Sequence, residues 1–405
     1  MVTGNKIVTS ESVTEGHPDK VCDMISDAIV DACIAQDPMS RVGCDVLVKA
    51  KKDYYSESLV SHVKIGGEIT SNADIPGFGF DEIIRNTIKD IGYDADWKGF
   101  NYKTCIIERM LTNQSPDISL GVTETCNREQ GAGDQGMMYG YACKDTAQLM
   151  PLPIELAHDL TYALTFARKS NTIRGLGPDG KSQVSVEYEN GRPLRLDAIV
   201  IAQQHHVDID ELFLKDAIRK HVIIPQCRNW IDEDTKIYVN ATGRFVVGGP
   251  EGDSGVTGRK IIVDTYGGVG RHGGGAFSGK DPSKVDRSGA YMARYIAKNI
   301  VAADLANECE VQISYAIGVA EPTSVYVDCF GTNKVDEERI SSAVMSVFDM
   351  RPKAIIENLG LRKPIYKITA SGGHFGREPN GDFFSWEKLD KVNPLRRYLD
   401  LPTNW

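Results

Sequence analysis

The sequence of 405 residues lacks the features that mark several large classes of protein. No run of 18 apolar residues occurs, so we expect no membrane-spanning helix. Positive charge is not in excess, with 46 Lys and Arg against 56 Asp and Glu, and an acidic chain is a poor ligand for nucleic acid or an anionic membrane. The first residues lack the apolar stretch of a secretory signal. We therefore expect a cytoplasmic protein that binds neither nucleic acid nor membrane.

Cysteine is present, but not in the patterns of a metal site or a disulfide framework. None of the nine cysteines forms a C-x-x-C pair, and Cys22 and Cys33 lie in apolar segments, as is typical of reduced, buried thiols. The motifs G-x-S-x-G and H-E-x-x-H are also missing. Glycine is the outlier, because 13 of its 39 residues lie between positions 243 and 279. The chemistry is therefore sought there.

The order of the expected elements repeats along the chain. Hydrophobic periodicity predicts a helix, two strands and a helix over 18–36, 41–49, 61–70 and 80–91. The same order returns over 153–168, 183–188, 194–203 and 210–222, and again over 284–304, 310–318, 323–330 and 336–348. We predict an α+β fold of three similar domains with pseudo-threefold symmetry, each an antiparallel sheet covered by helices on one face. Coincidence among generic elements is the alternative.

The repeat also suggests where the chain divides. We expect domains over 1–118, 132–247 and 248–405, with segments interleaved between them. Residues 113–131 mix Gly, Ser, Pro and polar residues without a core stripe. A stretch of this kind is either disordered or a lid over a site, and we expect a mobile lid.

The segment Thr14–Lys20 has the composition of an anion-binding helix start. Pro18 stands just inside the helix, where free backbone N–H groups and the helix dipole attract anions. His17, Asp19 and Lys20 could contact phosphate, metal and phosphate in that order. Ordinary helix capping would use the same residue types, so this segment alone does not decide between the two.

The segment Gly273–Arg287 combines glycines, which admit phosphate oxygens close to the backbone, with the charge of Lys280. It nearly matches the P-loop motif, but Asp281 stands at the Ser/Thr position. We predict a phosphate loop without the fold of a P-loop NTPase. Arg259 and Lys260 precede the apolar run 261–264, which we interpret as a buried strand next to a fixed cationic site.

Two further segments remain ambiguous. Phe245 is either a core residue, which the sequence alone favours, or a surface on which a base stacks. Asp179-Gly180-Lys181 precedes an expected strand and, taken alone, is a turn.

Four segments together resemble the S-adenosylmethionine synthetase (methionine adenosyltransferase) family of the bacterial type: His17-Pro-Asp-Lys20, Gly131-Ala-Gly-Asp134-Gln-Gly136, Gly273–Asp281 and His374-Phe-Gly-Arg377. The resemblance runs from about Lys6 to Arg377, and the second and third segments are highly specific to that family. It implies that the methionine sulfur attacks the ribose C5′ of ATP. Triphosphate leaves and is then hydrolysed to pyrophosphate and phosphate.

The resemblance also implies cofactors, assembly and site residues. It implies two Mg²⁺ ions per site, one K⁺ per subunit, and a homodimer, often paired into a tetramer, with active sites between subunits. The implied catalytic residues are His17, Lys181, Arg259 and Lys280. The implied ATP contacts are His17, Asp179, Lys181, Arg244, Phe245, Asp253, Arg259, Lys260, Ala276 and Lys280. The implied methionine contacts are Glu68, Gln114, Asp253 and Lys284, with Asp117 and Asp134 in or beside the site. The implied metal ligands are Asp19 and Asp286 for Mg²⁺ and Asp45 for K⁺.

The chain departs from the family pattern in two places. Asp45 stands where the family commonly has glutamate, which leaves K⁺ coordination in doubt. Residues 50–65 form a segment about ten residues longer than in compact bacterial relatives, and we expect an extended hairpin there.

Two other functions stay open. An ATP-dependent phosphotransferase could use the same glycine and lysine loop, but it would need a base near the acceptor, and His17 is the one obvious candidate. A regulatory nucleotide-binding protein without activity is disfavoured, because no cation of the phosphate site is missing. Product analysis separates these alternatives from adenosyl transfer.

Overall fold

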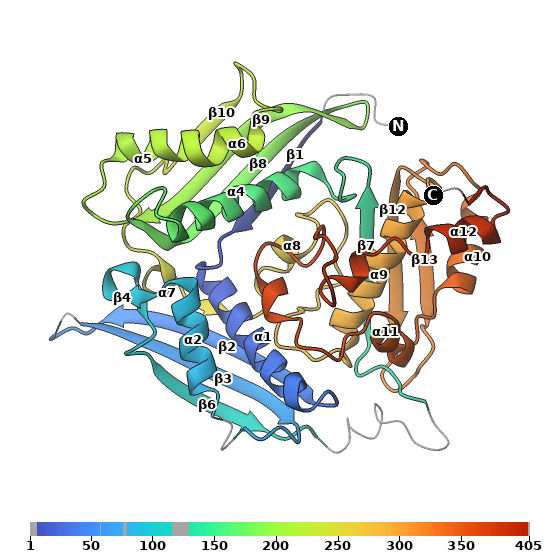
Figure 1. Ribbon diagram of the computed structural model, residues 1–405, viewed down its shortest axis with the longest axis horizontal. Helices are drawn as coiled ribbons and strands as arrows, with labels where there is room; N and C mark the ends of the chain where they lie inside the picture. Colours follow the sequence, from blue (N-terminus) through green and yellow to red (C-terminus); the bar gives the residue numbers. More distant parts are fainter. Residues whose placement is uncertain (1–5, 57, 76–78, 116–128, 404–405) are drawn as a thin grey trace.

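The computed structural model describes residues 6–56, 58–75, 79–115 and 129–403. Helix, two strands and helix occur in that order three times along the chain. Apart from one two-stranded sheet, the described strands form three sheets, and Figure 1 shows the helices of each on one face. The predicted fold class is confirmed.

The first unit contains α1 (Pro18–Gln36), β2 (Arg41–Lys52), β3 (Leu59–Thr70) and α2 (Asp81–Ile91). α1 begins where His17 caps the helix and Pro18 occupies the first turn, in which its missing N–H is dispensable. Alternate residues of β2 are buried and pack under α1, while the others face away from it. The unit continues through β4 (Asp94–Ala95), the 3-10 turn η2 (Asp96–Lys98), β5 (Phe100–Asn101) and β6 (Ile106–Thr112).

The second unit contains α4 (Leu152–Lys169), β8 (Leu176–Glu189), β9 (Arg192–His205) and α5 (Glu211–Ile218). The hairpin between its strands turns at Asn190 and Gly191, both with positive φ, as a two-residue turn requires. α5 runs on through a π-helical turn, η3 (Arg219–Ile223), into α6 (Ile224–Cys227), and β10 (Lys236–Val239) follows. The helix predicted over 210–222 is therefore longer than its apolar pattern indicates.

The third unit contains α9 (Val285–Ala302), β12 (Glu308–Tyr315), β13 (Ser324–Asp328) and α10 (Glu337–Val347). α9 is buried on nearly every side, because β7, β12 and later segments pack against it. The chain closes through α11 (Pro352–Asn358), the 3-10 turns η4 (Lys367–Ala370) and η5 (Ser385–Glu387), and α12 (Val392–Tyr398).

The three units exchange strands in a closed cycle. β1 (Lys6–Val13), which precedes the leading helix of the first unit, pairs with β8 of the second. β7 (Gly136–Cys143), which precedes α4, pairs with β12 of the third. β11 (Gly255–Val256), which precedes α9, pairs with β2 of the first. Each sheet therefore contains a strand that the preceding unit in the cycle supplies.

Three details refine the predicted elements. β6 and β10 pair in parallel with β3 and β9, because each follows a helical crossover. The run 261–264 is not a strand: it forms the short helix α8 (Ile261–Asp264), and three consecutive apolar residues have too little periodicity to distinguish a strand from a helix. The hairpin expected over 50–65 is present, since β2 and β3 pair up to Lys52 and Leu59.

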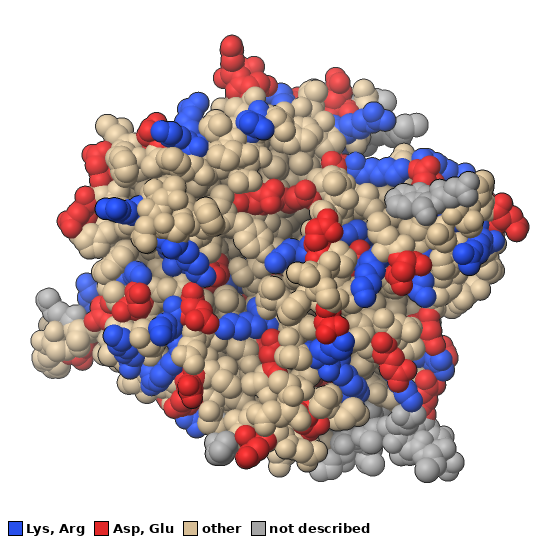
Figure 2. All heavy atoms as spheres, viewed as in Figure 1, with Lys and Arg blue, Asp and Glu red and all other residues tan. Residues whose placement is uncertain are grey.

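The apolar core follows the same organisation. The first and third units share one continuous cluster of buried side chains, and the second unit has a cluster of its own. The eight described cysteines are free and buried, as predicted, while Cys126 lies outside the described residues. None of the described helices combines the length and apolarity needed to span a bilayer. On the face drawn in Figure 2, basic and acidic side chains are interspersed.

Candidate functional site

His17 stands at the start of α1 with its imidazole almost completely buried. The backbone N–H of Asp19 donates to its Nδ1 over 3.2 Å. A nitrogen that accepts carries no proton, so the proton of the neutral ring is on Nε2. Burial, and then the nearby charges of Lys260 and Lys181, lower the pKa of His17 to about 3. The ring is thus a neutral hydrogen-bond donor at physiological pH.

Asp19 joins the helix start to the cations of residues 259 and 260. Its carboxylate lies 2.6 Å from Lys260 Nζ and 4.0 Å from Arg259 Nη1, and it accepts from the N–H of Val256 over 3.0 Å. Burial acts to raise the pKa of Asp19, but the hydrogen bonds from Lys260 and Val256 outweigh it and the pKa lies below its usual value. Arg259 remains more than half exposed, so its guanidinium is available to a ligand.

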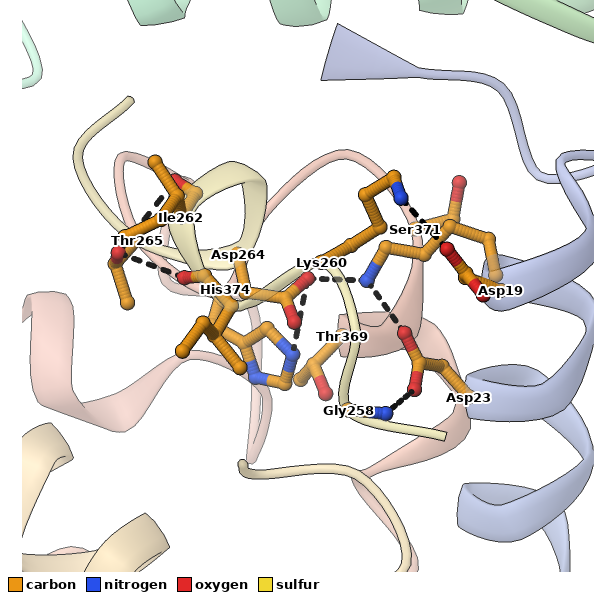
Figure 3. A network of polar contacts seen from close by, with 12 residues as sticks. Asp19, Asp23, Gly258, Lys260, Ile262, Asp264, Thr265, Thr369, Ser371 and His374 are labelled. Atoms are coloured by element: carbon orange, nitrogen blue, oxygen red, sulfur yellow. Dashed lines mark hydrogen bonds and ion pairs between the residues drawn. The ribbon is translucent and has the colours of Figure 1, made fainter. Parts of the chain in front are cut away.

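Lys20 does not face the site, which corrects the prediction that it contacts phosphate. Its side chain is fully buried between Asp23, 2.9 Å away, and Asp264, with which it forms a short ion pair. Burial alone would lower the pKa of Lys20, but these two carboxylates raise it. Figure 3 shows how the surrounding network joins α1 to the loop at Gly258 and to His374. Lys20 therefore links α1 to Asp264 through buried ion pairs and does not face the site.

Asp179 and Lys181 lie on β8, next to the helix start. Asp179 is buried, and one of its oxygens accepts from the N–H of Gly249 over 2.9 Å. Its other oxygen, Oδ1, is buried and has no hydrogen-bond partner among the described residues. Burial raises the pKa of Asp179 to about 6. Lys181 is exposed, as is Asp253, whose charge acts on Asp179.

Arg244 and Phe245 follow in the same region. The backbone of Phe245 exchanges hydrogen bonds with His205 at the end of β9, through its N–H and its carbonyl. The Phe245 side chain is half-buried and belongs to neither apolar cluster. Phe245 therefore lies outside the apolar core, where the sequence alone favoured placing it. Arg244 is exposed.

The glycine loop presents Lys280 beside Asp286, and the two side chains form a short ion pair. A Cβ atom at Gly275 would come within 2.2 Å of Asp286 Oδ1, so glycine at this position leaves the carboxylate its space. Ala276 is half-buried and faces Gly258, where an added Cβ would approach it to 2.5 Å. The loop therefore lies directly against the segment that carries Arg259 and Lys260.

A cavity of about 360 Å³ opens on the other side of this loop. Six of the predicted site residues line it together: Glu68, Gln114, Asp134, Lys280, Lys284 and Asp286. Lys284 Nζ pairs with a carboxylate oxygen of the buried Asp281 over 2.5 Å, which holds the ammonium group in the cavity wall. The structure thus brings the predicted methionine residues, apart from Asp253, to one hollow. Asp117 lies outside the described residues.

The predicted residues therefore form two groups in the chain. The first contains His17, Asp19, Asp179, Lys181, Arg244, Phe245, Asp253, Arg259 and Lys260, and the second lines the cavity. Among the described residues, no side-chain ion pair joins the first group to the second.

The carboxylates of the site are suitable metal ligands, but they do not form a complete set of ligands around one point. Among the described residues, no group of three or more His, Cys, Asp or Glu side chains is arranged to hold an ion. Mg²⁺ often takes one or two carboxylates and completes its shell with substrate phosphates and water. Asp19, which pairs with Lys260, and Asp286, which pairs with Lys280, fit that requirement. Asp45 is exposed; desolvation raises its pKa and the charge of Lys280 opposes the rise.

The fold and the site together define a class: proteins of three strand-exchanging α+β units whose loops bring cations close to a buried, neutral histidine. Family models agree with that description. The N-terminal, central and C-terminal domains of S-adenosylmethionine synthetase match residues 5–116, 129–245 and 247–388. The chain belongs to the S-adenosylmethionine synthetase family. The predicted membership and the predicted enzyme class are confirmed.

Individual relatives are similar over nearly their whole length. The S-adenosylmethionine synthase of Sorangium cellulosum is 55% identical over 401 residues, which cover 98% of this chain and 90% of the relative. The synthase of Desulfosudis oleivorans is 54% identical over 96% of this chain and 97% of its own. That of Solidesulfovibrio magneticus is 52% identical over 98% and 99%.

Proposed function

We propose that the protein joins ATP and L-methionine into S-adenosylmethionine with triphosphate as the leaving group. The observation that carries the proposal is the pairing of a neutral His17, which presents an Nε2 donor, with three cations in the same region, Lys181, Arg259 and Lys260. Such a group of donors suits an anion that gains charge during the reaction.

The reaction needs little else from the protein. The lone pair of the methionine thioether attacks C5′ of the ribose, the C5′–O bond breaks, and its electron pair leaves with the triphosphate. A thioether carries no proton to remove, so a general base is unnecessary. Hydrolysis of the triphosphate to pyrophosphate and phosphate then consumes one water.

We assign the nucleotide to the first group of residues and to the glycine loop. His17 donates a hydrogen bond to the bridging oxygen of the leaving group. Lys181, Arg259 and Lys280 stabilise the negative charge that develops on the triphosphate. Asp179, Arg244, Phe245, Asp253, Lys260 and Ala276 contact the nucleotide. Phe245 offers a ring face to the base.

We assign methionine to the cavity of about 360 Å³. Glu68 suits the ammonium group of the amino acid and Lys284 suits its carboxylate, while Gln114 and Asp253 complete the contacts. Asp134 and Asp117 are proposed to lie in or beside this site.

Mg²⁺ is proposed at Asp19 and Asp286, two ions per site, and K⁺ at Asp45. When bound, Mg²⁺ neutralises the charge of the phosphate oxygens. Asp19 pairs with Lys260 and Asp286 pairs with Lys280, so each carboxylate lies next to a cation that we assign to the phosphates.

The two groups of residues also support a dimer. We propose that the first group of one subunit meets the cavity of its partner, so that each complete active site lies between subunits, and that dimers pair into tetramers. The boundaries at 118, 132 and 248, the mobile lid over 113–131 and the cytoplasmic location remain proposals. Residues 116–128 of that lid lie outside the described residues.

Product analysis tests the proposal. The protein is incubated with ATP, methionine and Mg²⁺, and products are identified by mass. S-adenosylmethionine with pyrophosphate and phosphate is the expected result. ADP with a phosphorylated acceptor would establish phosphoryl transfer instead, and unchanged ATP and methionine would contradict both activities.

A further inference from the structure

Helix α1 carries aspartate at every fourth position of one face: Asp19, Asp23, Asp27 and Asp31. Residues four apart on a helix lie one above the other. Each of these carboxylates accepts a hydrogen bond from a backbone N–H of a segment far away in the sequence. We call this row of four the aspartate ladder.

The second member, Asp23, holds the loop of the exposed cations. Its Oδ1 accepts from the N–H of Gly258 over 2.9 Å, and the side chain is fully buried. Gly258 has a φ of 77°, and a Cβ there would approach Ala276 to 2.5 Å. The next two residues are Arg259 and Lys260. Asp23 therefore holds the backbone directly before two cations.

The third member, Asp27, holds the glycine loop in the same way. Its Oδ1 accepts from the N–H of Gly279 over 2.9 Å, and Gly279 has a φ of 80°. The next residue is Lys280. Arg287 grips both oxygens of Asp27 over 2.7 and 2.8 Å and also donates to the Lys280 carbonyl over 3.0 Å.

The two contacts share one design. A buried carboxylate fixes the amide of a left-handed glycine, and the following residue is a cation proposed to contact phosphate. Glycine is the most flexible residue of a loop, so such an amide needs an anchor if the next side chain is to start from one position. A misplacement of about 1 Å can cost roughly 10² in rate.

We propose that Asp23 and Asp27 are positioning residues that set Arg259, Lys260 and Lys280 for catalysis without touching the substrate. The identity of the ligand rests on the function proposed above. Asp31 provides an internal comparison, because it accepts from the N–H groups of Tyr366 and Lys367 over 2.9 and 2.8 Å. That segment carries no residue assigned to the site.

The first experiment compares Asp23→Ala with Asp31→Ala. We expect kcat of folded Asp23→Ala to fall by about 10- to 100-fold, with the methionine KM changed by less than about threefold, because the loss is one of cation placement. Asp31→Ala loses two amide contacts, so its thermal midpoint should fall while its kcat stays within about threefold of wild type. Equal kcat for both folded variants would overturn the proposal.

A second pair covers the case in which Asp23→Ala does not fold. Asp23→Asn keeps an acceptor oxygen in place and loses the charge, while Asp23→Glu keeps the charge and moves the oxygens by one methylene. If the held amide matters, kcat of the Asn variant exceeds that of the Glu variant by tenfold or so. The reverse order would show that the charge next to Lys20 matters instead, and the positioning role would fall.

Binding of inorganic tripolyphosphate separates this proposal from the proposed function. Calorimetry should show weaker tripolyphosphate binding by Asp23→Ala than by Asp31→Ala. If the wild type makes no S-adenosylmethionine but this difference is present, the positioning role of Asp23 is supported and the proposed function is contradicted. If the wild type is active and the two folded variants match it in both turnover and tripolyphosphate binding, the ladder is wrong.

Discussion

Replacement of Lys280 by alanine tests the electrostatic account of the site most directly. Lys280 and Asp286 form an ion pair, and Lys280 has 28% of its side chain exposed in the cavity wall. Lys280→Ala removes a cation from the triphosphate and also leaves Asp286 as an unpaired negative charge beside it. Both consequences oppose the departure of an anion.

The expected magnitude follows from Coulomb's law. Two unit charges about 4 Å apart interact by roughly 4 kcal/mol in a medium of effective dielectric constant near 20. Partial exposure reduces this value, and loss of one transition-state donor typically costs about 10²–10³ in kcat. We expect kcat of Lys280→Ala to fall by that factor, while ATP affinity measured without methionine changes much less.

The assay is formation of S-adenosylmethionine at saturating ATP and methionine, with ATP affinity measured separately. Lys284→Ala is the matched control, because Lys284 lies in the same cavity wall but pairs with Asp281. Its main effect should be a higher methionine KM. A Lys280→Ala enzyme with near-normal kcat and only a raised ATP KM would refute the reasoning.

Three further outcomes are expected. Burial and the charges of Lys260 and Lys181 lower the pKa of His17 to about 3, so the ring stays neutral above that pH. The kcat of the wild type and that of His17→Asn should therefore depend on pH in the same way between pH 5 and 9. An ionisation near pH 6.5 that appears in the wild type alone would contradict this expectation. Asp45→Glu should tighten K⁺ activation, because the carboxylate reaches about 1.5 Å farther, and superimposable K⁺ activation curves would show that the substitution is silent. Glu387 is fully buried and accepts hydrogen bonds from Arg294, Lys298 and the backbone N–H of Gly376. Glu387→Ala should therefore lower the free energy of unfolding, measured with urea, by about 3–5 kcal/mol and leave kcat of the folded enzyme unchanged. A decrease below about 1 kcal/mol would contradict that expectation.

The helices and most long strands could be predicted because periodicity is a local signal. The stripe of α1 and the alternation along β2 are read within one segment each. The strand exchange could not be predicted, because β11 has two residues and pairs with a strand about 200 positions earlier. A segment that short leaves no pattern.

The candidate site shows the same division. The loop before Lys280 could be predicted as a phosphate loop, because its glycines and its lysine are close together in the sequence. The burial of Lys20 was missed because its partner Asp264 is 244 residues away. The role of Asp23 and Asp27 was also missed, although the sequence shows their four-residue spacing. The sequence does not show which distant backbone N–H groups, those of Gly258 and Gly279, these carboxylates bind.

The cyclic exchange of strands has a consequence for biosynthesis. Val13 of β1 pairs with Lys181, so β1 waits for its partner strand until another 168 residues (181 − 13) have been synthesised. At about 5–20 residues per second, that delay lasts on the order of ten seconds. β2 waits longer for β11. No unit can complete its sheet from its own residues, so the nascent chain carries open strand edges until late in synthesis, when such edges are open to pairing with other chains.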